Sequence, residues 1–449
     1  MKALKPILAV VLLLVLAFAA VPNVGAQAQG GLTYTSGVQV QNLGSATANI
    51  TITFYNQDGT QAGSLSDTIG GSSSKTYFPV QGVSAGFNGS AVVSSDQPVA
   101  AIMNLLANNS AYAGSATGLT AGSTNVGIPL VMRNNGGFST WFNVQNTGTT
   151  ATTVTVSYKP AGVGNVATEQ ATIQPGAAKT FDQFTNTSLG DKFVGSASVS
   201  SDQPVAVMVN QVGVGSVKSL LTYDGFAAGS TSVSLPLIMA NNSGFFTGIS
   251  VQNVGSAATT VTIDYGPNTA GTFDPANETF TLQPGEGRPV LQSGAAWTSR
   301  YVGSATVTAD QPLVAVVNQL RTGAQVGTAY EGFNPTNLTT KVSIPLLMAN
   351  NGGFSTGLQC QNAGTSAITI DIDYSANTAG SFNPADVTGL PIAPGASVTV
   401  LQSGPAFGTN RYVGGATVTA NGGNVACIVN QLGSNTAADQ FLTYDGINF

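Results

Sequence analysis

Residues with reactive side chains are few in this sequence, and their types limit the chemistry. The chain contains no histidine, which removes Ser-His-Asp and Cys-His nucleophile systems and histidine-ligated zinc or iron sites. Asp371 and Asp373 lie two positions apart beside Tyr374, so a strand would place both carboxylates on one face. A glycosidase needs two carboxylates in a cleft, whereas an exposed strand face explains this pair without catalysis. We therefore predict that the protein is not an enzyme.

Other acidic residues are better explained as parts of turns. The tripeptide Asp-Gln-Pro occurs three times, beginning at Asp96, Asp202 and Asp310. An aspartate that recurs before proline in this way is typical of a turn in which its carboxylate accepts a bond from nearby backbone. Residues 56–59 (Asn-Gln-Asp-Gly) resemble part of a calcium-ligand loop but lack its remaining acidic positions. We expect no cofactor, with calcium as the alternative.

An Asn-Asn-x-Gly-Phe loop occurs three times and offers a candidate contact surface. Its amide groups and aromatic ring suit sugar stacking or contact with a protein. A phenylalanine after glycine equally suits a plug in the core, so both interpretations stay open. The candidate contact residues are Asn134, Asn135, Phe138, Trp141, Asn241, Asn242, Phe245, Asn350, Asn351 and Phe354.

The composition is that of a globular chain with little charge. Charged residues make up 7% of the 449 residues, hydrophobic residues make up 42%, and glycine numbers 55. A disordered chain has the opposite balance, and this length suits about three or four domains. The sequence has no basic stripe for phosphates and no polybasic segment for anionic lipid. We expect neither a nucleic-acid partner nor membrane insertion of the mature chain.

Residues 1–26 have the pattern of a secretory signal peptide. Lys2 and Lys5 precede an apolar run over residues 7–20, and small residues follow. Cleavage is expected after Ala26, with Ala28 as the alternative. An uncleaved membrane anchor is the competing interpretation, but the run is short for about 30 Å of hydrocarbon. We predict a secreted protein that is extracellular or lies at the cell surface.

Four copies of one sequence pattern follow this leader. The motif Val/Cys-Gln-Asn-x-Gly has its asparagine at Asn42, Asn146, Asn253 and Asn362, which are almost evenly spaced. A period of roughly 105 residues is too long for a solenoid and suits a chain of independent globular domains. The predicted divisions are 1–26 for the signal peptide and 27–122, 123–230, 231–339 and 340–449 for the four repeats.

Each repeat has the pattern of a β-sandwich. Residues 153–158 alternate apolar and polar side chains after a turn signal at residues 146–149. Residues 205–210 are apolar at both parities up to Asn210, as expected for a strand central in its sheet. Seven or eight short strands in about 105 residues describe a sandwich. No convincing helical period occurs after residue 26.

The order of these motifs resembles the immunoglobulin-like repeats of bacterial secreted and surface proteins, and most of all the cell-adhesion-related type. The resemblance covers nearly the whole mature chain, and its motifs are strand and turn patterns such as residues 144–148. It implies an all-β fold of four tandem immunoglobulin-like β-sandwich domains. It also implies extracellular scaffolding or adhesion, without naming a ligand.

The two cysteines of the sequence both lie in the fourth repeat. Cys360 replaces the valine of the repeated motif, and Cys427 lies in the apolar run before Asn430. In immunoglobulin folds the corresponding strands face one another across the sandwich, and an exported protein meets oxidising conditions. We predict a Cys360–Cys427 disulfide, with two buried thiols as the alternative.

The first repeat differs from the others at its start. A strand with the sequence Ile/Leu-Pro-Leu precedes the Asn-Asn loops of repeats two to four, at residues 128–130, 235–237 and 344–346, whereas the first repeat begins at Gly30 without one. If this strand belongs to the preceding sandwich instead, the fourth repeat is the one that is short by a strand. Its absence indicates either a modified cap or a sheet edge that a second subunit completes, which would give head-to-tail filaments. We expect a structural or adhesive protein whose partners are itself, other surface proteins or glycans. A carbohydrate-binding array that uses the Asn and aromatic loops is the alternative.

Overall fold

Nearly all of the described chain is β-structure. The computed structural model describes residues 10–14, 31–71, 73–78, 80–108, 111–215, 217–323, 326–434 and 439–449. In these ranges helical structure is limited to short 3-10 turns, among them η2 (Thr187–Leu189) and η3 (Pro335–Asn337). None of the helices described there has the length and apolar character needed to cross a membrane. The predicted all-β class is therefore confirmed.

The strands form four sets, called units 1 to 4, which follow the four sequence repeats. Unit 1 contains β1 (Val10–Leu14), β2 (Tyr34–Asn42), β3 (Ala48–Asn56), β4 (Gln61–Ile69), β5 (Ser74–Tyr77), β6 (Gly89–Ser95), β7 (Val99–Ala107) and β8 (Tyr112–Thr117). Unit 2 contains β9 (Ser123–Arg133), β10 (Phe138–Asn146), β11 (Thr152–Val163), β12 (Ala167–Ile173), β13 (Ala178–Asp182), β14 (Phe193–Gly213) and β15 (Leu220–Asp224).

The later two sets repeat this order. Unit 3 contains β16 (Ser230–Ala240), β17 (Phe245–Asn253), β18 (Thr259–Tyr265), β19 (Glu278–Leu282), β20 (Gly287–Leu291), β21 (Tyr301–Arg321) and β22 (Gly327–Glu331). Unit 4 contains β23 (Lys341–Ala349), β24 (Phe354–Asn362), β25 (Ile368–Tyr374), β26 (Val387–Ile392), β27 (Ser397–Leu401), β28 (Tyr412–Asn421), β29 (Val425–Gly433), β30 (Phe441–Asp445) and β31 (Ile447–Asn448).

Each unit is built from two sandwich-like layers of antiparallel strands. In unit 1 the layers are the sheets β1-β6-β3-β4 and β5-β2-β7-β8. In units 2 and 3 a single strand of 21 residues, β14 or β21, runs through both layers. The first part of β14 pairs with β9 and β11, and its second part pairs with β10 and β15. The same two layers therefore recur in every unit.

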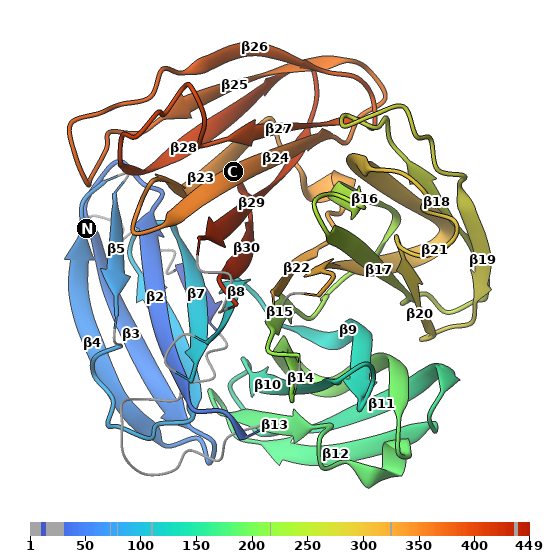
Figure 1. Cartoon of the computed structure of the whole chain (residues 1–449). Coiled ribbons are helices and arrows are strands. Elements are labelled where there is room, and N and C mark those ends of the chain that lie inside the picture. Colours follow the sequence, from blue (N-terminus) through green and yellow to red (C-terminus); the bar gives the residue numbers. More distant parts are fainter. Residues whose placement is uncertain are drawn as a thin grey trace, which may run out of the picture.

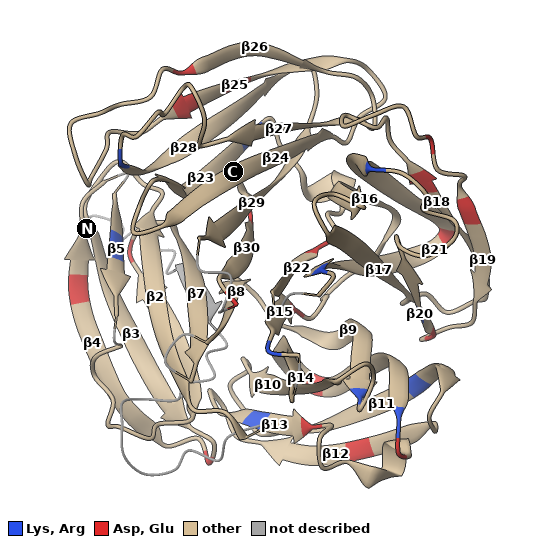
Figure 2. Ribbon diagram, in the orientation of Figure 1, with Lys and Arg blue, Asp and Glu red and all other residues tan. Residues whose placement is uncertain are grey.

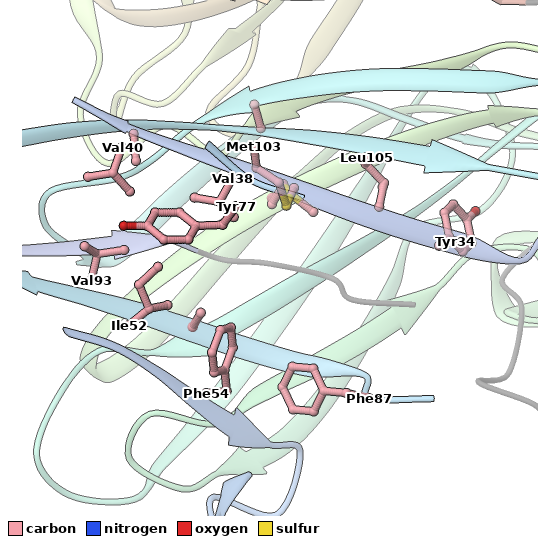
Figure 3. Close-up of a cluster of buried hydrophobic side chains, with 14 of the residues drawn as sticks. Tyr34, Val38, Val40, Ile52, Phe54, Tyr77, Phe87, Val93, Met103 and Leu105 are labelled. Atoms are coloured by element: carbon pink, nitrogen blue, oxygen red, sulfur yellow. The ribbon is translucent and has the colours of Figure 1, made fainter. Parts of the chain in front are cut away.

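The layers enclose separate apolar cores, as expected for a chain in which few side chains are charged (Figure 2). In β3, Ile50, Ile52 and Phe54 are buried and alternate with more exposed residues. Figure 3 shows side chains from both layers of unit 1 meeting in one interior, with Val38 on one side and Ile52 on the other. Each unit has such a cluster, which the period-2 pattern of the sequence predicts.

The four units are arranged in a closed ring around β8, β15, β22 and β30 (Figure 1). These four strands, called the axial strands, contact one another in the cyclic order β8, β15, β22, β30. The strand beside each axial strand inserts apolar side chains into the cluster of the preceding unit. At equivalent positions these include Ile102, Met208, Val316 and Ile428, which lie in the clusters of units 4, 1, 2 and 3, respectively.

This packing differs from the independent domains that the repeat length suggested. The apolar run Val205–Asn210 is buried at both parities, because one face covers its own core and the other covers the neighbouring unit. A run of this kind fits a strand that is central in its sheet, as β14 is. Its side chains must also be buried by other elements on both faces of that sheet. The neighbouring units supply that cover.

Buried amide pairs join successive units near the axis. Gln211 and Asn318 exchange two hydrogen bonds of 2.9 and 2.6 Å between units 2 and 3. Gln319 and Asn430 do the same at 3.0 and 2.8 Å between units 3 and 4. Unit 1 has Leu105 where units 2 to 4 have glutamine, so the buried side-chain amide of Asn210 has no partner among the described residues. The amide pairs therefore fix how unit 3 is aligned with units 2 and 4 at the axis.

A second series of contacts joins the units farther from the axis. The hydroxyl groups of Ser90, Ser196 and Ser304 each donate to the carbonyl oxygen of a Pro-Gly turn glycine in the next unit, at 2.5, 2.8 and 2.6 Å. Unit 4 has Gly415 at this position in its Val-Gly-Gly-Ala sequence. The junction of units 4 and 1 instead uses a bond of 3.1 Å from Ser343 Oγ to Gln41 Oε1.

Asp439 of unit 4 ties the axial strands of the other three units together. Its carboxylate accepts hydrogen bonds from the backbone N–H groups of Leu220 at 2.9 Å and Gly327 at 3.0 Å. A third bond comes from the N–H of Ala113. The side chain is fully buried, and burial raises the pKa of Asp439 while the three donors act in the opposite direction.

Residues 10–14 occupy the place of the strand that the first repeat was predicted to lack. β1 pairs antiparallel with β6, with Val10 opposite Ser95 and Leu14 opposite Ala91. The strands β9, β16 and β23 hold this position in units 2, 3 and 4. This edge of unit 1 is therefore paired while residues 10–14 are present. The two alternatives for its start, a modified cap or an edge completed by a second subunit, stay predictions for the chain cleaved after Ala26. The rest of the predicted signal peptide, with both cleavage positions, lies outside the described residues.

The predicted disulfide is confirmed, but its position in the sandwich differs from expectation. Cys360 and Cys427 are bonded, with their Cα atoms 4.1 Å apart. They are direct partners on the neighbouring strands β24 and β29 of one sheet, and they do not face one another across the two layers. The bond therefore joins two strands that the backbone ladder already pairs.

Replacing both cysteines by valine is expected to leave the fold intact, because Val144 and Val207 form the corresponding pair in unit 2. The free energy of unfolding should fall by up to about 4 kcal/mol, the chain-entropy estimate for a loop of this length. Denaturant unfolding of the variant, with reduced wild-type protein as the control, measures the change. Two free thiols per chain in the unfolded, unreduced wild type would contradict the bond.

An acidic chamber on the central axis as candidate functional site

The four axial strands end at the same level along the axis, and three of them end in an acidic residue. Thr117, Asp224, Glu331 and Asp445 are the ladder partners of Ile102, Met208, Val316 and Ile428. Because those partners occupy equivalent places in the four units, the residues at the strand ends do so as well. Three carboxylates and one hydroxyl therefore surround the axis.

Buried tyrosines hold three of the axial strands in place just before these residues. The hydroxyl of Tyr223 donates to the carbonyl of Leu130 at 2.6 Å and accepts from the N–H of Leu130 at 3.3 Å. Tyr330 and Tyr444 make the same pair of bonds to Leu237 and Leu346. Since successive strand residues point to opposite sides, fixing the tyrosine toward the core directs the following carboxylate toward the axis.

The strand ends open into a chamber of about 500 Å³. All four units contribute to its wall, which contains Thr117, Asp224, Glu331 and Asp445 together with apolar side chains such as Phe226 and Phe333. The Gly-Phe steps that follow Asp224 and Glu331 form single bridges back to β9 and β16 of their own units. These bridges position the two aromatic side chains beside the carboxylates.

The three carboxylates are poorly compensated. Asp224 is 8% exposed, and among the described residues its carboxylate has no hydrogen-bond partner or cation beside it. Glu331 accepts a hydrogen bond from the backbone N–H of Asp224 and shares one with Asp445. The Oδ1 atom of Asp445 is buried without a partner in the described part of the chain. Burying ionised carboxylates without a partner costs free energy, because they lose their solvation by water and gain no hydrogen bond or ion pair in return.

Burial raises the pKa of each carboxyl group in the chamber, and repulsion between the groups adds to this rise for Asp224 and Asp445. Burial is the larger cause for Asp224, and the charge of Glu331 adds to it. The pKa of Asp445 rises well above its usual value, through burial and the neighbouring Glu331. The pKa of Glu331 rises through burial alone, against the bonds it accepts. Folding therefore favours retention of protons at the axis.

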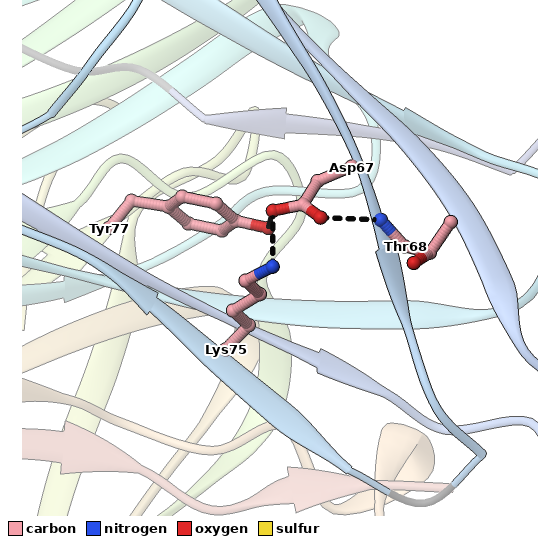
Figure 4. Close-up of polar contacts among 4 residues, drawn as sticks. All are labelled: Asp67, Thr68, Lys75 and Tyr77. Carbon is pink, nitrogen blue, oxygen red and sulfur yellow. Dashed lines mark hydrogen bonds and ion pairs between the residues drawn. The ribbon is translucent and has the colours of Figure 1, made fainter.

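The ion pair between described residues lies elsewhere, between β4 and β5, which belong to the two different layers of unit 1. Lys75 Nζ is 2.6 Å from Asp67 Oδ2, and the Tyr77 hydroxyl donates to the same carboxylate at 3.2 Å (Figure 4). Lys75 holds the pKa of Asp67 below its usual value. No such cation accompanies the axial carboxylates among the residues that the structure describes.

The predicted contact loops use their asparagines within the protein. Asn134, Asn241 and Asn350 adopt the left-handed conformation, with φ of 49°, 48° and 49°. Their side-chain amides donate to carbonyl groups of a neighbouring loop, including those of Asp191, Trp297 and Asn410. Asparagine tolerates this backbone conformation, so the residue type has a structural reason at all three positions.

The second asparagine of each loop contacts a methionine and, in two units, an arginine. The amides of Asn135, Asn242 and Asn351 lie 3.5, 3.3 and 3.2 Å from the sulfur atoms of Met132, Met239 and Met348. Arg300 and Arg411 donate to the amide oxygens of Asn242 and Asn351, each at 2.8 Å. These contacts leave less of the loops free for a partner.

The aromatic residues of these loops are partly or fully covered. Trp141 is 3% exposed, and its indole nitrogen donates to the Tyr34 hydroxyl of unit 1 at 3.3 Å. The ring centroid of Phe245 lies 5.4 Å from that of Phe441 in unit 4. Phe138 and Phe354 are half-buried. Trp141 and Phe245 therefore serve contacts between units, and binding of an outside partner by the loops stays a prediction.

The other predicted acidic residues are tied into local hydrogen bonds. Asp371 accepts from the backbone N–H of Gly389 at 2.7 Å and from Asn421 at 2.9 Å, and these bonds lower its pKa. Asp58, in the possible calcium loop, accepts from the N–H and hydroxyl of Thr60 at 2.9 and 2.6 Å. Among the described residues, no group of three or more His, Cys, Asp or Glu side chains is placed to hold a metal ion.

The axial carboxylates were missed in the sequence, although a signal for them exists. The sequence Tyr-Asp/Glu-Gly occurs at residues 223–225, 330–332 and 444–446, once per unit from unit 2 onward. The step between copies is close to that of the other repeat landmarks. A tyrosine followed by an acid at the end of each apolar strand could have indicated a recurring buried hydroxyl and a shared acidic site.

Comparisons with known proteins identify no family. No family model and no curated protein matches the chain. Among solved structures, the chain is similar to one described as the crystal structure of Thermotoga maritima 1070, with 16% sequence identity and a TM-score of 0.20. The similarity covers 23% of this chain and 94% of the other. A TM-score this low carries no argument about fold or function.

The raised pKa values of the chamber predict a stability that falls as pH rises. Above about pH 4, where free Asp and Glu ionise, the unfolded chain releases protons that the folded chain retains, so the free energy of unfolding decreases up to the folded pKa values. The isosteric variant D224N/E331Q/D445N should lose this part of the dependence. Urea unfolding between pH 4 and 8 measures it.

The matched control for this experiment is D191N/D264N/D274N, which removes three exposed carboxylates instead. It should keep the pH dependence of the wild type. If the free energy of unfolding instead varies with pH in the same way in the wild type and in the axial variant, the axial groups ionise as freely in the folded protein as in the unfolded chain. That result would contradict the raised pKa values.

Proposed function

We propose that the protein is an exported, non-catalytic structural module in which four immunoglobulin-like β-sandwich domains act as one rigid ring at the cell surface or in an extracellular matrix. The observation that carries the proposal is the closure of the ring within one chain, because Asp439 of unit 4 binds units 1, 2 and 3 and amide pairs join unit 3 to units 2 and 4. A closed ring holds its outer sheets in a fixed arrangement, which suits a scaffold that presents several similar surfaces.

The chemistry of the chain supports a location outside the cell. The Cys360–Cys427 disulfide is of the kind that persists in oxidising compartments. The surface is polar mainly through Ser, Thr, Asn and Gln, since charged residues are 7% of the sequence. Together with the leader pattern of residues 1–26, these features favour export.

The rim of the ring offers the surfaces for adhesion or self-assembly. The edge strands β4, β12, β19 and β26 lie at the periphery (Figure 1), and edge strands can pair with strands of another molecule. Filament formation through these edges is one form that the proposed function can take. The carbohydrate-binding alternative has less support, because Trp141 and the first asparagine of each loop are engaged inside the protein.

Small-angle scattering and negative-stain microscopy of the protein from its native source test this proposal. A compact ring of about 420 residues should have a radius of gyration of roughly 22 Å and appear as a four-lobed particle, alone or joined at its rim. Surface labelling of intact cells should reach it. An elongated string of domains, or a protein protected from labelling until the cells are broken, would overturn the proposal.

A further inference from the structure

We propose that the axial chamber is a binding site for a small organic cation with one or more ammonium groups, such as a linear diamine. The proposal concerns the chamber alone and does not depend on export or on a role at the cell surface. It assigns a ligand class to the three carboxylates, which no contact within the described part of the chain neutralises.

The first argument is the unpaired state of the carboxylates. Asp224 is more than nine-tenths buried, lines the chamber and has no hydrogen-bond partner for its carboxylate among the described residues. The Oδ1 atom of Asp445 is, within the same part of the chain, also buried and unpartnered. Leaving such groups without a partner is unfavourable, because burial removes the water that would otherwise solvate them. A cation in the chamber would supply the missing partner for both.

The second argument is the shape and lining of the chamber. A volume of about 500 Å³ lies within the range of about 300–1,000 Å³ that is usual for small-molecule sites. The wall combines carboxylates with the aromatic side chains Phe226 and Phe333. Ammonium groups are attracted both to carboxylates and to aromatic faces, and the methylene groups of a diamine suit the remaining apolar wall.

The third argument separates an organic cation from a metal ion. The axial carboxylates do not form a group placed to hold one metal ion among the described residues. They come instead from three units around a wide chamber. Glu331 and Asp445 share a hydrogen bond, whereas Asp224 has none to either of them through its carboxylate. A diamine can reach Asp224 with one ammonium group and the Glu331–Asp445 pair with the other.

A ligand in this position would contact three units at once. Because it would bind the closed ring and not the separated units, it would stabilise the ring by mass action. Unit 1 has Thr117 where the other units have an acid. The fourth side of the chamber is therefore the place where an added carboxylate should strengthen binding.

Isothermal titration of the full chain with 1,4-diaminobutane at pH 7.5 and low salt tests the proposal. We expect binding of one ligand per chain and an increase in Tm. The variant D224N/D445N should weaken binding at least tenfold, whereas the control D191N/D264N, which removes two exposed carboxylates, should not change it. The variant Thr117→Asp should tighten binding, and it keeps the test decisive if D224N/D445N does not fold.

Two outcomes would overturn the proposal. One is the absence of any diamine binding by the folded wild type. The other is diamine binding that D224N/D445N and Thr117→Asp both leave unchanged, because the ligand would then lie elsewhere. A parallel titration with calcium chloride distinguishes the ligand class, and tighter binding of calcium than of the diamine, lost in D224N/D445N, would show a metal site in place of the proposed one.

Discussion

The carboxylate of Asp439 is the contact on which the closed arrangement depends most. It belongs to unit 4 and accepts backbone N–H groups from the axial strands of units 1, 2 and 3. A single buried acceptor thus satisfies three donors that would otherwise be unpaired at the start of those strands. The bond from Ala113 joins unit 4 to unit 1, so it forms only when the last unit has returned to the first.

The ring has the form of a fourfold assembly, yet one chain allows its four parts to differ. Unit 1 carries Leu105 and Thr117 at positions where the other units carry glutamine and an acid, and unit 4 carries Gly415 where the others have serine. The first two changes alter contacts at the axis, namely an amide pair and a carboxylate of the chamber, and the third alters a bond between neighbouring units farther from the axis. Four identical subunits could not make a chamber with three acids and one hydroxyl.

Local features of the fold were predictable because they depend on neighbours in sequence. The period-2 pattern of residues 153–158, the repeated turns and the cysteine pair predicted strands, four repeats and the disulfide. The ring was not predictable in this way. Asp439 occurs in no repeated motif, and the second buried face of Val205–Asn210 looks the same whether a sheet or a neighbouring unit covers it. The Tyr-Asp/Glu-Gly repeat did mark the chamber, but its carboxylates meet only through the ring.

The most direct test of ring closure is the stability of Asp439→Ala compared with Asp439→Asn in denaturant unfolding. Alanine leaves three buried N–H groups without an acceptor, each worth about 1–3 kcal/mol, so we predict a loss of at least roughly 3 kcal/mol. Asparagine keeps one oxygen and should lose less. Exposed surface substitutions usually change the free energy of unfolding by no more than about 0.5 kcal/mol. If the alanine variant lies within that margin of the wild type, the result would contradict a ring held together at Asp439.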